Sequence, residues 1–259
     1  MQAFDRVLAA RAKDRPGSAD FIANIFDDFT ELRGDRRYGD DKAILAGIAS
    51  LDGMPVTVVA TQKGTDTAGR VAANFGCAHP EGYRKALRQF RLAEKFSRPV
   101  VTLIDTAGAY CGLGAEERGQ AQAIAECLTT LMTLRTPVIA LLTGEGGSGG
   151  ALALAVADRV WMMENAVYSV ISPEGCASIL WKDASKTEDA ARSLKLTAED
   201  LHHFGIVESI LPEGAGFDRA YTDVKARLKE TFKILKALPM EELLQHRYCR
   251  YRTMGGFQE

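Results

Sequence analysis

The chain has 259 residues, of which 46% are hydrophobic, and a formal net charge of −2. This is enough apolar material for one large domain or two small ones, and the near-neutral charge excludes a global attraction to nucleic acid or an anionic membrane. The amino terminus lacks a basic stretch followed by an apolar core, and no apolar run approaches the roughly 20 residues that span a bilayer. We therefore expect a soluble cytoplasmic protein without membrane association.

Strands and helices are expected to alternate along the chain. The expected helices are 1–33, 80–96, 115–134, 151–157, 173–181 and most of the remaining chain. The expected strands are 44–51, 56–61, 99–104, 137–142, 158–163, 167–171 and 206–211. The Asp52-Gly53 pair predicts a hairpin turn, and 158–163 is expected to pair with 167–171. Pairs of strands precede single helices more than once, which indicates an α/β fold other than a plain βαβ series.

No linker or repeat divides the chain, so we expect a single domain of residues 1–259. It would comprise an amino-terminal helical segment (about 1–33), a core (about 34–211) and a carboxyl-terminal helical region (about 212–259). The polar segment 62–76, which carries Lys63 and Arg70, is either a surface loop or a ligand-contacting loop. The five cysteines are irregularly spaced and include no C-x-x-C pair, which argues against disulfides and against a metal site.

Two glycine-rich loops each follow an apolar strand and precede a helix. One contains Gly108 and Ala109, and the other is Gly144–Gly150. Loops at the carboxyl ends of neighbouring parallel strands converge, so their backbone amides are expected to face one small volume. Two converging amides are what a developing oxyanion requires.

The sequence of Gly144–Gly150 allows comparison with three other known motifs. A Walker loop requires a lysine that is absent, and a dinucleotide fingerprint is not followed by the βαβ unit it needs. A G-x-S-x-G nucleophile elbow does fit, with Ser148 as nucleophile. Asp183 or Asp189 and His202 or His203 would complete that triad. A serine hydrolase therefore stays open as the alternative function.

Several longer stretches resemble the α subunit of bacterial acetyl-coenzyme A carboxylase carboxyltransferase. They are 62–64, 74–76, 80–85, 98–106, 114–120, 144–151, 168–182 and 247–251, and the likeness covers roughly residues 16–252. The stretch 168–182 is highly specific. The resemblance implies a crotonase (ClpP/crotonase-like) fold, a spiral of ββα units with additional helices.

The resemblance also implies the activity, which is transfer of a carboxyl group from carboxybiotin to acetyl-CoA to form malonyl-CoA for fatty acid biosynthesis. In that family the biotin is attached to a separate biotin carboxyl carrier protein and is carboxylated by biotin carboxylase. A β subunit with a zinc ribbon supplies most of the acetyl-CoA site, in an α2β2 assembly. This chain has neither zinc cysteines nor a Met-Lys-Met biotin acceptor. A crotonase-like acyl-CoA scaffold without catalysis is a third hypothesis.

The site residues follow from this resemblance. Backbone amides of Gly149 and Gly150 are expected to stabilise the biotin oxyanion, with Gly108 and Ala109 as a second, less constrained pair. Four further residues are expected to line the substrate site: Gly146, Gly147, Ser148 and Tyr110. The family's Pro-Gly-Ala-Tyr-Pro-Gly loop here reads Ala107 to Gly112, with a cysteine at 111. Without the two prolines, that loop is expected to be more flexible.

Overall fold

The computed structural model describes residues 1–214 and 216–255. Within them, an eight-stranded sheet runs in the order β1-β2-β3-β4-β5-β6-β8, and β7 pairs with β5 off this path. The strands are β1 (Asp27–Glu31), β2 (Ile44–Leu51), β3 (Met54–Thr61), β4 (Val100–Thr106), β5 (Val138–Gly147), β6 (Arg159–Met163), β7 (Val167–Ser169) and β8 (Ser209–Leu211). The pairs β3–β4 and β4–β5 are parallel, so these three strands end at the same edge.

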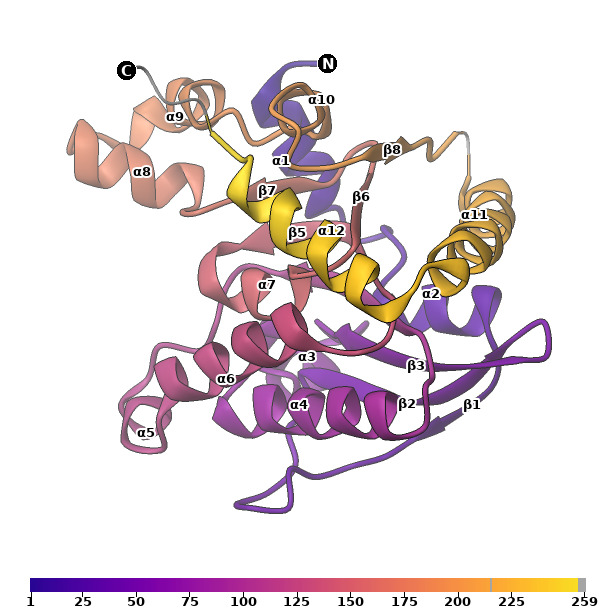
Figure 1. The fold of residues 1–259 in the computed structure, drawn as a ribbon. Helices are drawn as coiled ribbons and strands as arrows, with labels where there is room; N and C mark the ends of the chain where they lie inside the picture. The colour runs from indigo at the N-terminus through magenta and orange to yellow at the C-terminus, as the bar shows by residue number, and fades with distance from the viewer. Residues whose placement is uncertain (215, 256–259) are drawn as a thin grey trace.

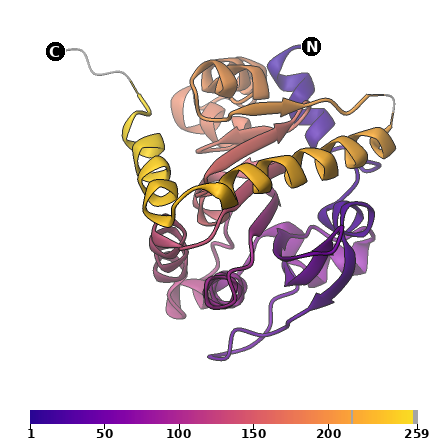
Figure 2. The same ribbon diagram turned by 45° about the vertical axis from the view of Figure 1, so that its right-hand side comes forward.

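Helices surround this sheet (Figure 1). They are α1 (Ala3–Ala10), α2 (Ser18–Ile25), α3 (Thr67–Ala72), α4 (Pro80–Lys95), α5 (Leu113–Glu117), α6 (Gln120–Thr133), α7 (Ser148–Ala155), α8 (Pro173–Leu180), α9 (Thr187–Leu194), α10 (Ala198–His203), α11 (Phe217–Ala237) and α12 (Met240–Arg252), with short 3₁₀ turns η1 (Asn74–Gly76) and η2 (Ala184–Lys186). Figure 2 shows α11 running across the molecule and α12 turning away from its end. No helix in the described ranges is both long and apolar enough to cross a membrane.

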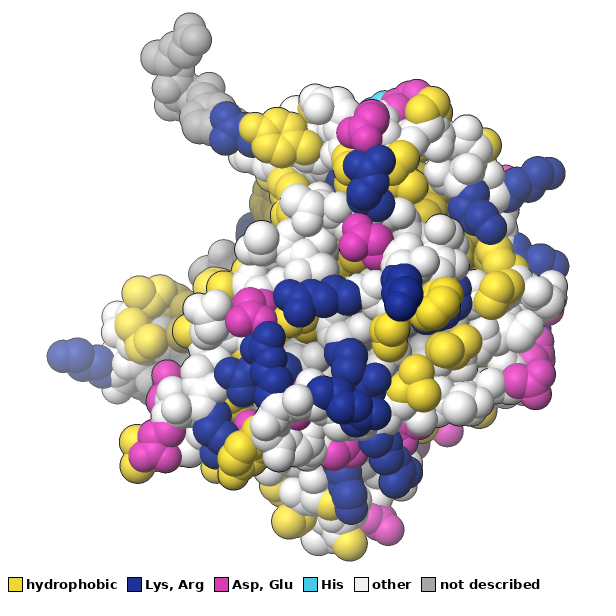
Figure 3. All heavy atoms as spheres, turned by 60° about the horizontal axis from the view of Figure 1, so that its bottom comes forward, with side chains coloured by type: hydrophobic (Ala, Val, Ile, Leu, Met, Phe, Trp, Pro, Cys, Tyr) yellow, Lys and Arg dark blue, Asp and Glu magenta, His cyan; other side chains and the backbone are white. Residues whose placement is uncertain are grey.

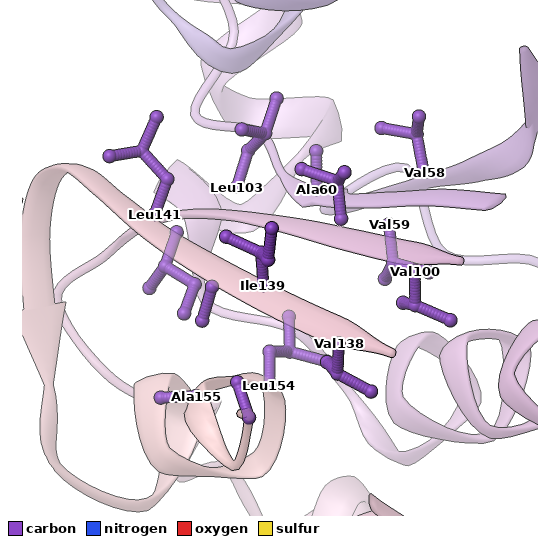
Figure 4. Close-up of a cluster of buried hydrophobic side chains, with 14 of the residues drawn as sticks. Val58, Val59, Ala60, Val100, Leu103, Val138, Ile139, Leu141, Leu154 and Ala155 are labelled. Atoms are coloured by element: carbon purple, nitrogen blue, oxygen red, sulfur yellow. The ribbon is translucent and has the colours of Figure 1, made fainter. Parts of the chain in front are cut away.

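The core is centred on β3, β4 and β5. Every residue of β4 is buried, because helices cover both faces of this parallel part of the sheet. Side chains from neighbouring strands, among them Val59, Leu103 and Ile139, pack together in Figure 4, and Leu154 of α7 closes the cluster. This packing fixes where β4 and β5 end and therefore where their loops begin.

The predicted hairpin is confirmed. β2 and β3 pair antiparallel in register, and the two turn residues both have positive φ, at 48° for Asp52 and 83° for Gly53. Positive φ at both positions is the geometry of the type I′ turn, which matches the twist of the flanking strands.

The helical segment predicted over 1–33 is interrupted by residues 11–17, which separate α1 from α2, and the prediction is wrong beyond Ile25. Residues 27–31 instead form β1, which pairs antiparallel with β2, with Thr30 opposite Ile48. Asp28 has a φ of 54°, a left-handed conformation that is incompatible with a continuing helix. Pairing with the exposed edge of the hairpin outweighs the helical spacing of the apolar residues.

Two further expectations need correction. The segments 158–163 and 167–171 do not pair with each other, since β6 and β7 each pair in parallel with β5. β5 is ten residues long, so it accommodates β6 along its first half and β7 beside its glycine-rich end. The helix predicted over 115–134 is divided into α5 and α6 at Gly119, whose φ is 79°.

Candidate active site

The two glycine-rich loops lie against each other at the carboxyl ends of β4 and β5, as expected from the sequence. A Cβ added at Gly147 would lie 2.0 Å from the carbonyl oxygen of Ala107, and one added at Gly150 would lie 2.4 Å from the amide nitrogen of Ala109. Glycine is required at both positions because backbone of the neighbouring loop occupies the space of a side chain.

Three backbone N–H groups at this junction are candidate donors to a ligand. The amide of Ala109 has no hydrogen-bond acceptor among the described residues, and Gly149 and Gly150 belong to the first turn of α7, whose amides have no acceptor within the helix. The amide of Gly108 is different, because it donates to Thr106 Oγ1 at 3.1 Å. In the second predicted pair, the Ala109 amide is therefore available to donate to a ligand, whereas the Gly108 amide already donates within the protein.

Hydrogen bonds hold the loop at 107–112. The amide of Tyr110 donates to the carbonyl of Ala78 at 3.0 Å, and Gln120 Nε2 donates to the carbonyl of Tyr110 at 2.8 Å. The Tyr110 ring packs on His79 with ring centres 4.2 Å apart. Cys111 is exposed beside these contacts.

A cluster of charged side chains lies at the ends of β4 and β5, where the two loops begin. Lys63 Nζ is 2.7 Å from a carboxylate oxygen of Asp105, at the end of β4, and 2.7 Å from one of Glu145, in β5. Asp105 Oδ1 also accepts the amide of Glu145 at 2.8 Å. Lys63 thus connects the two strand ends that carry the candidate donor amides.

Arg11 joins this cluster from the segment after α1. Its Nε is 2.6 Å from Glu145, and its guanidinium also contacts Glu174 at 2.7 Å. Burial by itself would raise the pKa of Glu145, but Lys63 and Arg11 outweigh it and hold this pKa below its ordinary value. Burial opposes the charge on Lys63 too, yet the two carboxylates raise its pKa. Glu145 and Lys63 are therefore both charged at neutral pH.

A cavity of about 830 Å³ opens beside the cluster. Ala107, Lys63 and Glu145 line it on one side, and Arg70 with other residues of 62–75 lines it on another. The polar segment 62–76 is thus a cavity wall that includes α3 and η1. A cavity at the carboxyl ends of parallel strands is the usual position of a substrate site in α/β proteins.

Ser148 does not belong to a catalytic triad here. It has a φ of 48° and an exposed side chain, as in a nucleophile elbow. However, no histidine or aspartate in the described residues hydrogen-bonds to it, and His202 and His203 are exposed on α10. Three other residues are predicted to line the substrate site. Gly146 and Gly147 are the last two residues of β5, and Tyr110 lies in the 107–112 loop with an exposed side chain.

The sequence interpretation missed the role of the Lys63, Asp105, Glu145 and Arg11 cluster. A signal was present, since Asp105 and Glu145 each interrupt the apolar end of a strand just before a glycine loop. A carboxylate in such a buried position requires a partner.

The mixed α/β structure, with two glycine-rich loops meeting at the carboxyl ends of β4 and β5, has a crotonase-like fold. Solved structures agree. A transcarboxylase 12S chain superposes with a TM-score of 0.73 at 20% identity, over 92% of this chain and 45% of that one. A chain of a Pseudomonas malonate decarboxylase superposes with a TM-score of 0.68 at 20% identity, over 84% and 89%.

Sequence comparison gives the particular family. The model described as acetyl co-enzyme A carboxylase carboxyltransferase-like matches residues 1–255. The α subunit of acetyl-coenzyme A carboxylase carboxyl transferase from Ruminiclostridium cellulolyticum is 58% identical over 98% of both chains. The α subunit from Carboxydothermus hydrogenoformans is 56% identical over 98% of this chain and 80% of its own. The chain belongs to this family of carboxyltransferase α subunits, which are components of a multi-subunit acetyl-CoA carboxylase.

Proposed function

We propose that this chain supplies the biotin half of an active site that transfers a carboxyl group from carboxybiotin to acetyl-CoA. The observation that carries the proposal is the junction of the two loops beside a large cavity, where the unbonded amide of Ala109 lies against the first turn of α7 with the amides of Gly149 and Gly150. Gly146, Gly147, Ser148 and Tyr110 are proposed to line the substrate path.

The chemistry requires such donors. When the carboxyl group leaves the biotin nitrogen, negative charge develops on the ureido oxygen. Preorganised amides stabilise that charge, each contributing about 3–4 kcal/mol in comparable sites, and the start of α7 adds its dipole. The biotin then accepts a proton from the methyl group of acetyl-CoA, and the resulting enolate attacks the released carboxyl group. This sequence of steps needs no side-chain base from this chain.

The assembly implied by the proposal has separate parts. A zinc-containing β subunit would complete the acetyl-CoA side in an α2β2 complex. The biotin would be carried to the site on a carrier protein after its carboxylation by biotin carboxylase. No metal is assigned to this chain.

The test is reverse transfer by the complex purified after co-expression with a candidate β subunit. Acetyl-CoA formation from malonyl-CoA is measured with and without free biotin. Biotin-dependent turnover by the complex, absent from either chain alone, is the expected result. A complex that forms but shows no dependence on biotin would overturn the proposal. Fluorophosphonate labelling of Ser148 would favour the hydrolase in its place.

A further inference from the structure

A second concave site lies outside the cavity beside the loops. It is a groove of about 350 Å³ between the outer face of α4 and the turn that starts at Asp35, and its apolar contribution comes from Leu87 and Leu92. Its basic lining consists of Arg36, Arg37, Arg84, Arg88, Arg91 and Lys95. Figure 3, which brings the α4 side of the molecule forward, shows Lys and Arg side chains gathered on this face.

The positive charge in this groove is hardly neutralised. Its one acidic residue, Asp35, accepts the backbone amides of residues 37–39 at 2.8–2.9 Å and offsets part of the charge of Arg84, which leaves the cations in excess. Among the described residues, Arg37 is the only one of the six cations in an ion pair, with Glu126 at 3.4 Å. By contrast, Lys85 of the same helix contacts both Glu31 and Asp40. The groove therefore keeps uncompensated charge in a chain that is slightly acidic overall.

Part of the groove is rigidly arranged. The Arg88 guanidinium donates to the carbonyls of Leu32, Arg33 and Gly34 at 2.6–3.0 Å, which fixes its position. Arg84 Nε is buried and has no hydrogen-bond partner in the described residues. Burial and the neighbouring Arg36 lower the pKa of Arg88. Crowding like charges in this way costs free energy that a bound anion would recover.

We propose that this groove binds an organic phosphate of nucleotide size with at least two anionic groups. Planar guanidinium groups match phosphate oxygens bidentately, which favours phosphate as the recognised group. The volume lies within the range of small-molecule pockets, about 300–1,000 Å³. The two leucines and the arginine stems supply apolar surface for a ring. This site is separate from the carboxyl-transfer site and does not depend on it.

The test is calorimetric titration of the full-length chain at low ionic strength with ADP and, separately, with pyrophosphate. The informative variant is Arg91→Gln/Lys95→Gln, because neither side chain makes an intramolecular hydrogen bond in the described residues. The matched control is Lys233→Gln/Lys236→Gln, which removes the same charge from a separate concave site on α11. Circular dichroism of all three proteins verifies that the fold is unchanged.

We expect saturable ADP binding whose Kd rises at least about tenfold in the groove variant and stays within about twofold in the control. Pyrophosphate is expected to bind the same groove more weakly, because it lacks the ring. The proposal is contradicted if ADP shows no saturable binding, if both variants lose affinity equally, or if pyrophosphate binds as tightly as ADP. Saturable binding of polyglutamate without binding of ADP would also overturn it and would indicate an acidic protein partner.

Discussion

Gly150 is one of the two glycines at which the glycine-rich loops are in close backbone contact. Any side chain there would overlap the backbone at 108–109, since its Cβ would lie 2.5 Å from the Gly108 carbonyl carbon. We predict that Gly150→Val displaces the 107–112 loop and abolishes biotin-dependent transfer while the domain stays folded. Turnover by the co-expressed complex and circular dichroism are the measurements.

The matched control for this substitution is Gly39→Ala. An added Cβ at Gly39 meets no atom within 4 Å, and its φ is not positive. Activity close to wild type is expected from the control. Near-normal turnover of Gly150→Val would contradict the placement of the oxyanion site at this junction.

Lys63 determines the stability of both strand ends. We predict that Lys63→Met lowers the free energy of unfolding by about 3–5 kcal/mol, because it leaves two largely buried carboxylates without their shared cation. The comparison is Lys229→Met, which removes an exposed partner of Asp52 and is expected to cost less than about 1 kcal/mol. Urea unfolding measures both, and equal losses in the two variants would refute the prediction.

At the scale of elements, the segment after α1 is fixed to the sheet by Arg15. Its guanidinium contacts Glu213 at 2.6 Å, with both side chains at least nine-tenths buried, and donates to the carbonyl of Thr143 just before the glycine turn. Burial would raise the pKa of Glu213, but Arg15 and Asn165 hold it below the ordinary value. A depressed carboxyl pKa stabilises the fold above the unfolded-state pKa, and this stabilisation is lost as the pH falls through the folded-state value.

The corresponding prediction concerns pH. Glu213→Gln is expected to destabilise the protein at neutral pH, and the difference from wild type is expected to shrink as the pH falls through the folded-state pKa of Glu213, which lies below its ordinary value. Urea unfolding across this range is the measurement. A difference that stays constant with pH would show that the charge of Glu213 is not what stabilises the segment.

Helix α12 is fixed by one buried arginine. Arg247 is 1% exposed, pairs with Asp158 at 2.8 Å, and also donates to the carbonyls of Leu131, Leu134 and Thr136. We predict that Arg247→Leu costs about 3–5 kcal/mol, because Asp158 is left as an unpaired buried charge. Thermal and urea unfolding measure it. Arg252→Leu, at an exposed position of the same helix, is the control, expected within about 0.5 kcal/mol of wild type.

At the scale of the whole molecule, apolar side chains near α8 are left uncovered. Val170, Ile179 and Leu180 are 76%, 68% and 66% exposed, and Trp181 is 41% exposed. They lie close in the chain to β7, which pairs with the glycine turn. Exposed apolar clusters of this kind mark interaction surfaces, and for a carboxyltransferase α subunit we expect the partner subunit to cover this one.

This expectation predicts that Leu180→Asp prevents co-purification with the β subunit without changing the fold of the chain. Ile234→Asp is the matched control, because Ile234 is 56% exposed on α11, away from this cluster in sequence. Retained co-purification of Leu180→Asp, or loss of it in both variants, would assign the interface elsewhere.

Local sequence by itself determined much of this protein. The hairpin at Asp52-Gly53, the buried strands, the glycine loops and the family resemblance follow from short-range signals, since φ preferences and apolar spacing act within a few residues. The same signals predicted that the loops converge, and the structure confirms it.

Tertiary structure decided the rest. Strand β1 exists because residues 27–31 find the edge of β2, and β6 and β7 both pair with the long β5. Only the folded chain shows that Thr106 occupies the amide of Gly108 and leaves that of Ala109 free. The Lys63 and Arg11 contacts to Glu145 join residues 82 and 134 positions apart. Such pairings depend on packing between distant segments, which local spacing and propensity do not encode.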